Sequence, residues 1–313
     1  MRAFVFPGQG TQPVGMGKEL FDTFPAAREV FERVEEALSR PITRLMFHGP
    51  QEELTETRHA QPAIMAVSLA VVAILQQEGS FFLARESSYA AGHSLGEYSA
   101  LAAYGSLSLE DTARLLSIRG EAMGRAVPAG VGGMCAVLGL EHSVVQKIAQ
   151  QALEKGVCTL ANDNCPGQVV LSGEKEALAF ATTLALNQGA KRVLPLEVSA
   201  PFHGPMMQPA QEEVRAALAR FPLKDPAVPL ISNVTAQPVA KGAVLADLLG
   251  EQVTHCVRWR ESIQCLADLG VDHCIEVGVG RVLTGLIRRT APEMRLSTLN
   301  TPHDIEQFLK ENA

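Results

Sequence analysis

The sequence predicts a protein of the α/β class, and the order of its predicted strands and helices is the main reason. Strands and helices alternate before residue 127 and after residue 198, which is typical of a mostly parallel sheet covered by helices. Between these points the predicted order is β-α-β-β-α-β, the order of a ferredoxin-like unit. We therefore expect a large α/β domain over residues 1–126 and 199–313, interrupted by a ferredoxin-like small domain over residues 127–198.

Hydrophobic patterning predicts the elements of the large domain. The expected strands are Arg2–Phe6, 88–91, 230–233 and 272–277. The expected helices are 24–38, 62–77, 97–103, 109–126, 206–220 and 281–289. The helix over 24–38 is amphipathic and has Pro25 in its first turn, whereas the segment 62–77 is apolar on all sides, as in a helix buried inside a domain.

The small domain follows a linker that is rich in glycine. Its expected strands are 134–138, 157–161, 168–171 and 192–198, and its expected helices are 143–153 and 174–187. Residues 162–167 contain asparagine, proline and glycine and are expected to form the turn between the second and third of these strands.

The composition restricts the class of protein. The chain has 313 residues, of which 47% are hydrophobic and 19% charged, and its formal net charge of −7 argues against a nucleic-acid binder. Its six cysteines form no C-x-x-C pair, so neither a zinc site nor a disulfide framework is expected. The start of the chain lacks the pattern of a secretion signal, and the longest apolar run, 63–75, is too short to cross a bilayer. We therefore expect a cytoplasmic protein that binds no membrane.

The segment Gly92-His93-Ser94-Leu95-Gly96 is a G-x-S-x-G motif between a predicted strand and a predicted helix. This is the context of a nucleophile elbow, in which a serine occupies a sharp turn and glycines stand where a Cβ atom would collide. A serine in an ordinary glycine-rich turn is the alternative. The flanking strand and helix favour the elbow, so Ser94 is the expected nucleophile and the large domain is expected to be α/β-hydrolase-like.

Arg119 lies on the apolar face of the helix over 109–126. A guanidinium in such surroundings is unfavourable unless an anion pairs with it. One interpretation is structural: the side chain reaches solvent or meets an acidic residue of the protein. The other is that its partner is the substrate.

A serine nucleophile needs a neighbouring base, and the chain offers eight histidines. His203 lies in a rigid loop, 199–205, where the chain returns to the large domain, and it is the best candidate. His273 and His255 remain alternatives at this point, since both lie near the expected core.

Several motifs in one order make the chain resemble the malonyl-CoA:acyl carrier protein transacylases over essentially its whole length. The motifs are FPGQGTQPVGMG from Phe6, QPAI from Gln61, GHSLGEYSAL from Gly92, RGEAM from Arg119, ANDNCPGQVVLSG from Ala161, Phe202-His203, SNVTA from Ser232 and EVGVGRVLTGL from Glu276. Where many relatives have Gly-Pro-Gly, this chain has Gly278-Val279-Gly280.

The resemblance implies a role for each of several residues. It implies that Ser94 is the nucleophile, that His203 is the general base, and that the backbone carbonyl of Gln252 orients His203. It further implies an oxyanion hole formed by the backbone N–H groups of Gln9 and Leu95, a malonyl-carboxylate clamp at Arg119, and a tight acyl pocket beside Phe202.

The resemblance also implies the reaction and its partners. Malonyl would pass from malonyl-CoA to Ser94 and then to the phosphopantetheine thiol of acyl carrier protein in fatty-acid synthesis. No cofactor is expected besides the coenzyme A thioester substrate, and no metal is expected. The protein is expected to be a monomer. Because acyl carrier protein is generally acidic and this chain is acidic too, we expect docking on a local basic patch formed by Lys191, Arg192, Arg288 and Arg289. The alternative is that these are four solvated surface charges.

Three alternatives stay open at this stage. The same serine and histidine could serve a thioesterase or another serine hydrolase, or a trans-acting acyltransferase of a polyketide synthase. A non-catalytic docking module is the third alternative, against which the intact Ser94, His203 and Arg119 argue.

Overall fold

Two β-sheets organise the chain in the computed structural model, which describes residues 1–10 and 12–312. The larger sheet has the order β10-β9-β1-β2-β7-β8, and every neighbouring pair is parallel except β7 and β8. Its strands are β1 (Arg2–Phe6), β2 (Tyr89–Gly92), β7 (Leu230–Ile231), β8 (Pro238–Val239), β9 (His273–Val277) and β10 (Arg295–Leu299). The predicted α/β class with a mostly parallel sheet is confirmed.

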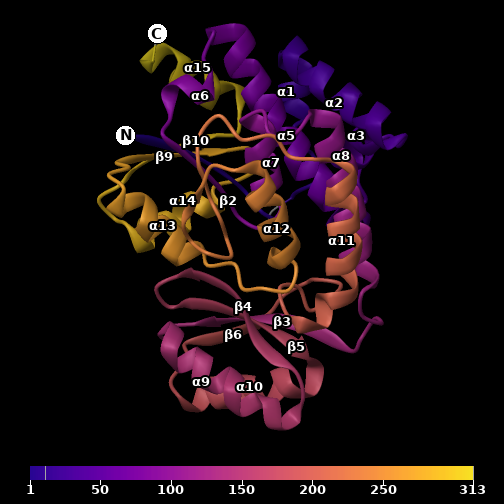
Figure 1. The fold of residues 1–313 in the computed structure, drawn as a ribbon, viewed down its shortest axis with the longest axis vertical. Coiled ribbons are helices and arrows are strands. Elements are labelled where there is room, and N and C mark those ends of the chain that lie inside the picture. Colours follow the sequence, from indigo (N-terminus) through magenta and orange to yellow (C-terminus); the bar gives the residue numbers. More distant parts are fainter. Residues whose placement is uncertain (11, 313) are drawn as a thin grey trace.

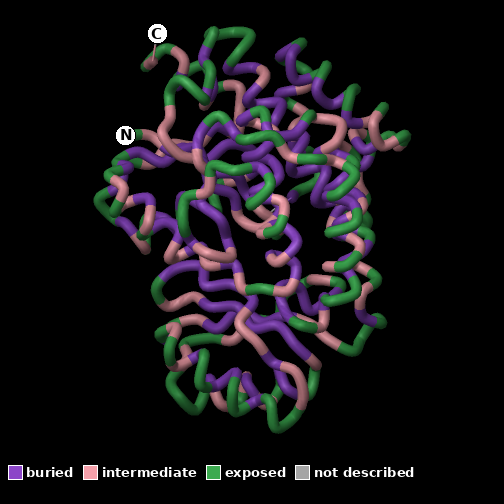
Figure 2. The backbone as a smooth tube through the Cα atoms, in the orientation of Figure 1, coloured by how far each residue is buried: buried purple, intermediate pink, exposed green. Residues whose placement is uncertain are grey.

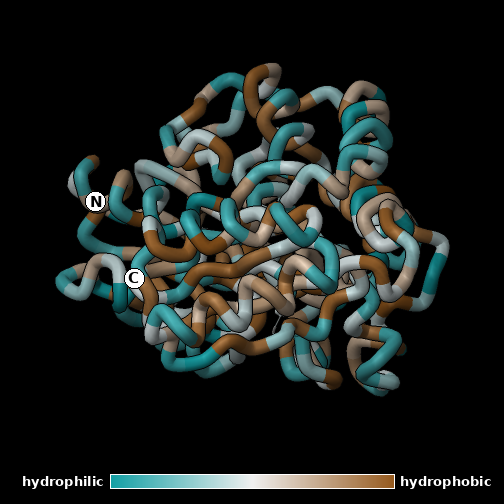
Figure 3. Tube along the Cα trace, turned by 90° about the horizontal axis from the view of Figure 1, so that it is seen from below, coloured by the Kyte–Doolittle hydropathy of each residue, from teal (hydrophilic) through white to brown (hydrophobic). Residues whose placement is uncertain are grey.

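Both faces of the parallel sheet are buried, and β1 shows how. Phe4 and Phe6 belong to one hydrophobic core, while Ala3 and Val5 belong to another on the opposite face. Alternate side chains of a strand point to opposite faces, so a strand covered on both sides must be apolar throughout. Figure 2 shows the result: buried residues follow the strands, and the outermost turns are exposed. In Figure 3 the hydrophilic stretches likewise gather on the outer coils.

The helices divide between these two cores. The helices around the large sheet are α1 (Lys18–Thr23), α2 (Pro25–Leu38), α3 (Ile42–His48), α4 (Gln51–Thr55), α5 (Thr57–Gly79), α6 (Leu83–Glu86), α7 (Gly96–Ala103), α8 (Leu109–Arg125), α11 (Gln208–Arg220), α12 (Gly242–Gln252), α13 (Trp259–Asp268), α14 (Val282–Thr290) and α15 (Pro302–Glu311). The helices α13 and α14 pack with Ala3 and Val5, and α2, α5, α7, α8 and α11 pack with Phe4 and Phe6.

The central helix α5 is longer than its predicted range of 62–77. It begins at Thr57 and carries Pro62 inside, and by length and composition it could cross a membrane. However, 83% of its most apolar window is buried inside the protein. An apolar surface on all sides is what a helix in the middle of a core requires.

The second sheet is antiparallel and has the order β4-β5-β3-β6. Its strands are β3 (Gly132–Leu138), β4 (Cys158–Cys165), β5 (Gln168–Glu174) and β6 (Arg192–Pro195). The helices α9 (His142–Ala152) and α10 (Lys175–Asn187) share a third core with these strands. In Figure 1 this sheet and its two helices form the lower end of the molecule, and both termini lie near the other end.

The predicted turn over 162–167 is wrong for its first four residues. Asn162 to Cys165 continue β4, and only Pro166 and Gly167 make the connection to β5. The extension has a structural cause, since Asn162 forms an isolated parallel bridge with Val257, which lies between α12 and α13. The end of β4 is thereby held against the part of the molecule that carries Ser94.

Candidate active site

The strand-to-helix turn between β2 and α7 holds Ser94 in a strained conformation. Its φ of 53° lies in the left-handed region, which residues other than glycine seldom adopt. A Cβ atom at Gly92 would lie 2.0 Å from the backbone carbon of Gly96, and one at Gly96 would lie 2.2 Å from the Phe6 carbonyl oxygen. Glycine at both positions therefore lets β1, β2 and α7 approach this closely. The turn presents Ser94 to a cavity at the carboxyl ends of the parallel strands.

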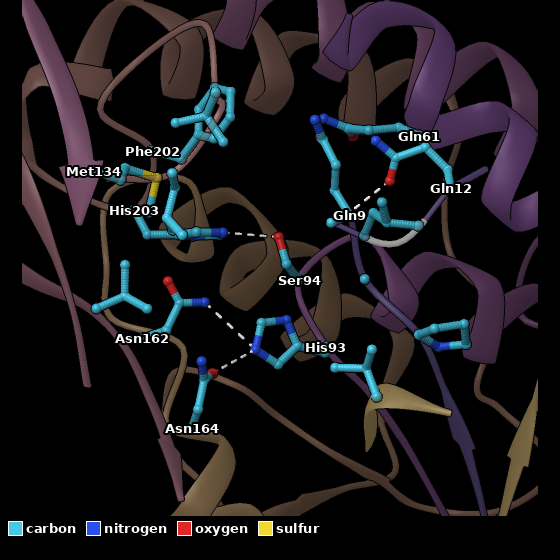
Figure 4. A pocket seen from close by; sticks show the side chains of 18 of the residues that line it. Gln9, Gln12, Gln61, His93, Ser94, Met134, Asn162, Asn164, Phe202 and His203 are labelled. Carbon is cyan, nitrogen blue, oxygen red and sulfur yellow. Dashed lines mark hydrogen bonds between the residues drawn. The ribbon is translucent and has the colours of Figure 1, made fainter. Parts of the chain in front are cut away.

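His203 is the histidine that the structure brings to Ser94. Its Nε2 lies 2.8 Å from the Ser94 Oγ, and its Nδ1 lies 2.9 Å from the backbone carbonyl oxygen of Gln252. A carbonyl only accepts, so Nδ1 carries the hydrogen and Nε2 is free to accept the hydrogen of the serine hydroxyl. His203 has a φ of 58°, so the loop holds this residue in the left-handed region too. Figure 4 shows the Ser94–His203 contact from close by.

The surroundings of His203 keep its ring neutral. It is 5% exposed, and burial lowers its pKa to about 3, with a further lowering from the nearby positive charge of Arg119. A neutral imidazole at neutral pH can take a proton from a hydroxyl.

Arg119 of α8 reaches the same point from the other side. Its Nη2 donates to the Ser94 Oγ at 3.0 Å and to the Gln252 side-chain oxygen at 2.8 Å, and its Nη1 donates to Gln61 Oε1 at 2.7 Å. It is 1% exposed, so its guanidinium does not reach solvent. Among the described residues no carboxylate lies within 4.0 Å of it, and its Nε has no hydrogen-bond partner. This buried cation therefore has neutral partners only.

Gln9 and Leu95 lie beside Ser94 on the wall of the cavity. Gln9 follows β1, and its side chain is fixed by Thr57 Oγ1, which donates to Oε1 at 2.9 Å. A Cβ atom at Gly8 would lie 2.6 Å from the His93 carbonyl oxygen, so the loop after β1 is packed directly against the elbow. Within residues 1–10 and 12–312, neither the Gln9 nor the Leu95 backbone N–H donates to a protein acceptor.

The cavity has a volume of about 660 Å³ and lies between the two sheets. Phe202 and Met134 line it near His203, and Asn162 and Asn164 line it from β4 (Figure 4). The ring of His93 turns from Ser94 toward these amides, with its Nε2 3.0 Å from Asn164 Oδ1 and 3.4 Å from Asn162 Nδ2.

The two other histidines considered as bases lie elsewhere. His273 begins β9 at the amino ends of the parallel strands, and its Nε2 contacts Ser297 Oγ at 2.9 Å. His255 is exposed, contrary to the expected core position, and its ring contacts the Glu251 carbonyl and Thr254.

A family model described as the acyl transferase domain matches residues 3–303. The chain belongs to this family. It is 43% identical to a protein named malonyl CoA-acyl carrier protein transacylase from Bacillus subtilis, over 99% of this chain and 97% of that protein. It is 40% identical to the protein of that name from Escherichia coli K12, over 96% of each.

Solved structures of malonyltransferases also superpose closely on this acyltransferase. An acyl-carrier-protein-S-malonyltransferase from Bartonella henselae superposes with a TM-score of 0.97 at 47% identity, covering 99% of this chain and 98% of that one. A malonyl-transacylase in complex with its type II polyketide synthase acyl carrier protein superposes with a TM-score of 0.95 at 35% identity, covering 99% of each chain.

Sequence reasoning assigned no role to three buried polar residues of the acyltransferase site. Asn233 Oδ1 accepts from the Ser94 backbone N–H at 2.8 Å, Gln61 accepts from Arg119, and Glu97 accepts from the Gln252 side chain. One signal was available: Glu97 and Gln61 are strongly polar residues among mostly small or apolar neighbours in their helices. Their partners are distant in sequence, so the patterns alone could not pair them.

The four basic residues predicted to dock a carrier protein are all exposed: Lys191, Arg192, Arg288 and Arg289. The Arg289 Nη2 donates to the Pro166 carbonyl at 2.8 Å, and the loops at Gly139 and Gly167 join through a backbone hydrogen bond of 2.8 Å. The Lys191 side chain packs over Gly139. Lys191, just before β6, and Arg289, in the last turn of α14, therefore lie near each other, and the Arg289 guanidinium contacts Gln168 of the cavity wall.

Among residues 1–10 and 12–312, no group of three or more histidine, cysteine, aspartate or glutamate side chains is placed to hold a metal ion.

Proposed function

We propose that this acyltransferase moves a malonyl group from malonyl-CoA to the phosphopantetheine thiol of acyl carrier protein, through a malonyl-serine intermediate, and so supplies malonyl carrier protein for fatty-acid synthesis. One observation carries the proposal: the Ser94 Oγ lies between the His203 Nε2 at 2.8 Å and the Arg119 Nη2 at 3.0 Å. A base and a fixed cation thus meet at a single hydroxyl.

The first half-reaction uses His203 as general base. Ser94 Oγ attacks the thioester carbonyl while its proton passes to His203 Nε2, and the Gln252 carbonyl holds the ring in the required tautomer. The oxyanion is received by the Gln9 and Leu95 N–H groups, which have no other acceptor in the described chain. Coenzyme A then leaves as the thiol, with the proton from His203. Losing one such donor costs about 10²–10³ in rate.

Arg119 binds the free carboxylate of the malonyl group. Its planar fork can bond both oxygens, and the carboxylate would supply the anion that the buried guanidinium lacks in the described residues. An acetyl group would leave this cation without an anionic partner, which costs about 2–3 kcal/mol in discrimination. Phe202 closes the wall next to His203 and restricts the size of the acyl group.

The second half-reaction reverses the roles. The phosphopantetheine thiol of the carrier protein gives its proton to His203 and attacks the malonyl ester, and Ser94 leaves with the proton from His203. Lys191, Arg192, Arg288 and Arg289 form the docking patch for an acidic carrier protein beside the cavity.

The domain division belongs to the same proposal. Residues 1–126 and 199–313 form an α/β-hydrolase-like catalytic domain, which the elbow between β2 and α7 supports. Residues 127–198 form a ferredoxin-like domain, which the antiparallel order β4-β5-β3-β6 supports. We further propose a cytoplasmic monomer without a cofactor.

Intact-mass measurement after incubation with malonyl-CoA tests the proposal. We expect one malonyl adduct on the wild-type protein, none on Ser94→Ala, and a rate of adduct formation lowered about 10²-fold in Arg119→Ala. Equal acylation by acetyl-CoA would contradict the role of Arg119. Release of free malonate without transfer to carrier protein would favour a thioesterase, and no adduct at all would favour a non-catalytic module.

A second acceptor has a specific observation in its favour. The structural likeness to a malonyl-transacylase bound to a polyketide carrier protein supports the same chemistry with a polyketide synthase carrier. Comparing kcat/KM for the two classes of carrier protein, with malonyl-CoA held constant, decides between them.

A further inference from the structure

Glu97 is a buried carboxylate directly behind the proposed nucleophile. It lies in the first turn of α7, is 1% exposed, and does not line the cavity. Its Oε1 accepts from the Asn233 backbone N–H at 2.7 Å, and its Oε2 accepts a short hydrogen bond from the Gln252 Nε2. A carboxylate buried in this way has a structural or functional reason, because burying it without these partners would be costly.

The partners of Glu97 set the orientation of the Gln252 carboxamide. The Nε2 also donates to the Ser94 carbonyl oxygen at 2.9 Å, so both acceptors lie on one side of the amide. The Oε1 therefore turns to the other side, where it accepts from the Arg119 Nη2 at 2.8 Å. That same nitrogen donates to the Ser94 Oγ.

We propose that Glu97 is a positioning residue that determines the preference for malonyl over neutral acyl groups, acting through the Gln252 carboxamide to hold Arg119 beside Ser94. The inference rests on the proposed function. Glu97 does not line the cavity, and its hydrogen-bonded route to Arg119 runs through the Gln252 amide.

The charge of Glu97 matters for a physical reason. Arg119 is buried with neutral direct partners among the described residues, and an amide aligned between a carboxylate and a guanidinium is polarised favourably at both ends. The guanidinium is then already in place when the substrate arrives, so that binding the malonyl carboxylate requires little rearrangement.

Protonation of Glu97 would reverse this arrangement. Both groups that face the carboxylate are N–H donors, so a carboxyl hydrogen would have no acceptor unless the Gln252 amide turned and withdrew Oε1 from Arg119. Burial raises the pKa of Glu97 to about 8, opposed by the hydrogen bonds from Asn233 and Gln252 and by the charge of Arg119.

The other titratable groups near Glu97 keep their charge across this range. Burial raises the pKa of Tyr98 to about 12, burial lowers that of His203 to about 3, and Arg119 stays a cation even though burial lowers its pKa. The malonyl preference should therefore rise as the pH rises through about 8, following Glu97 alone.

The test measures kcat/KM for malonyl-CoA and acetyl-CoA and uses their ratio as the readout. At about pH 9, where Glu97 is ionised in the wild type, Glu97→Gln turns one carboxylate oxygen into a donor facing a donor, so we expect the malonyl-to-acetyl ratio to fall about tenfold or more. Glu276→Gln is the matched control: Glu276 is also fully buried and accepts two backbone N–H groups, those of Leu283 and Thr284, at 3.0 and 2.8 Å. This control should alter both substrates in the same proportion.

A double-mutant cycle locates the effect. When Arg119 is already alanine, Glu97→Gln should change the ratio by less than about twofold, because the residue that Glu97 positions is absent. An equal loss in both backgrounds, or a ratio in Glu97→Gln that matches the wild type, overturns the inference.

The same measurements separate this inference from the proposed function. If the wild-type protein forms no malonyl-serine, the proposed function fails; if it does and the Glu97→Gln ratio is unchanged, only the inference fails. Should Glu97→Gln not fold, the wild-type pH profile decides: a ratio that stays flat from about pH 6 to 9 overturns it.

Discussion

The two ends of the parallel sheet carry matching pairs of residues in very different settings. At the carboxyl end His203 contacts the hydroxyl of Ser94 at 2.8 Å, and at the amino end His273 contacts that of Ser297 at 2.9 Å. Both histidines are 5% exposed. Each pair lies at or beside a cavity, of about 660 Å³ at the carboxyl end and about 730 Å³ at the amino end. Burial, a serine partner and a cavity therefore do not by themselves define an active site.

The backbone and the third partner distinguish the two ends. Ser94 stands on a turn with a φ of 53°, whereas Ser297 lies inside β10 and is held by the strand ladder. The His203 ring is fixed by the Gln252 carbonyl, and Arg119 adds a cation 3.0 Å from the Ser94 Oγ. The strained turn and the oriented base together distinguish Ser94, the candidate nucleophile, from Ser297.

The largest expected difference between the ends is in catalysis. His203→Ala should lower the rate of malonyl-serine formation about 10⁴-fold, because the serine loses its proton acceptor. His273→Ala should leave that rate within about twofold, and should lower the free energy of unfolding by about 1–3 kcal/mol through the hydrogen bond lost to Ser297.

Single-turnover acylation and urea unfolding of both variants measure this difference. A comparable loss of rate in His273→Ala would contradict the comparison, because it would make His273 a candidate base again. A His203→Ala variant with nearly normal acylation would also contradict the comparison, because it would show that His203 is not the base.

The local part of this site could be predicted from the sequence, and the reason is geometric. The elbow depends on glycines two residues either side of Ser94, and its strand and helix are neighbours in the chain. The alternation of strands and helices likewise predicted the α/β class and the parallel sheet. His203 was the best candidate base from its loop context and Arg119 stood out on an apolar helix face, whereas their specific roles followed from the family resemblance. The structure brings both to Ser94.

The non-local part could not be predicted in the same way. The Ser94 N–H bonds a side chain at position 233, and Glu97 bonds one at position 252, so these pairs exist only once the sheet has formed. The extension of β4 past Asn162 depends on its bridge to Val257, which outweighs the local turn signal. His255 was expected near the core, but it lies just after α12 in an exposed turn.

A smaller difference between the ends is expected in acid. Burial and the charge of Arg119 lower the pKa of His203 to about 3, and burial with the charges of Arg295 and Arg2 lowers that of His273 to about 4. Both values lie below about 6.5 for an unfolded histidine, so the unfolded chain binds more protons between these limits. Their contribution to stability is complete above about pH 6.5 and is lost as the pH falls.

The substitution His273→Gln and the pH profile of wild-type acylation separate the two histidines in this range. His273→Gln should flatten the dependence of the unfolding free energy on pH below 6.5 without altering the pH profile of acylation. With p-nitrophenyl acetate as a neutral acyl donor, stopped-flow acylation by the wild type should stay level as the pH falls through 6.5, because His203 remains neutral. A rate that halves near pH 6.5 would show a base with an ordinary pKa and contradict the role of the buried ring.

The smallest expected effect concerns the surface charges at the two ends. Lys191 just before β6 and Arg289 in the last turn of α14 lie beside the cavity that holds Ser94, and Arg85 and Arg295 line the cavity at the amino end. If an acidic carrier protein docks near Ser94, Lys191→Glu with Arg289→Glu should raise the KM for carrier protein about tenfold, with a weaker effect at high salt. The KM for malonyl-CoA in the first half-reaction should change little.

Arg85→Glu with Arg295→Glu makes the same change in net charge at the far end and is the matched control. Equal responses of the two double variants would mean that net charge, and not the patch at the cavity mouth, governs carrier docking.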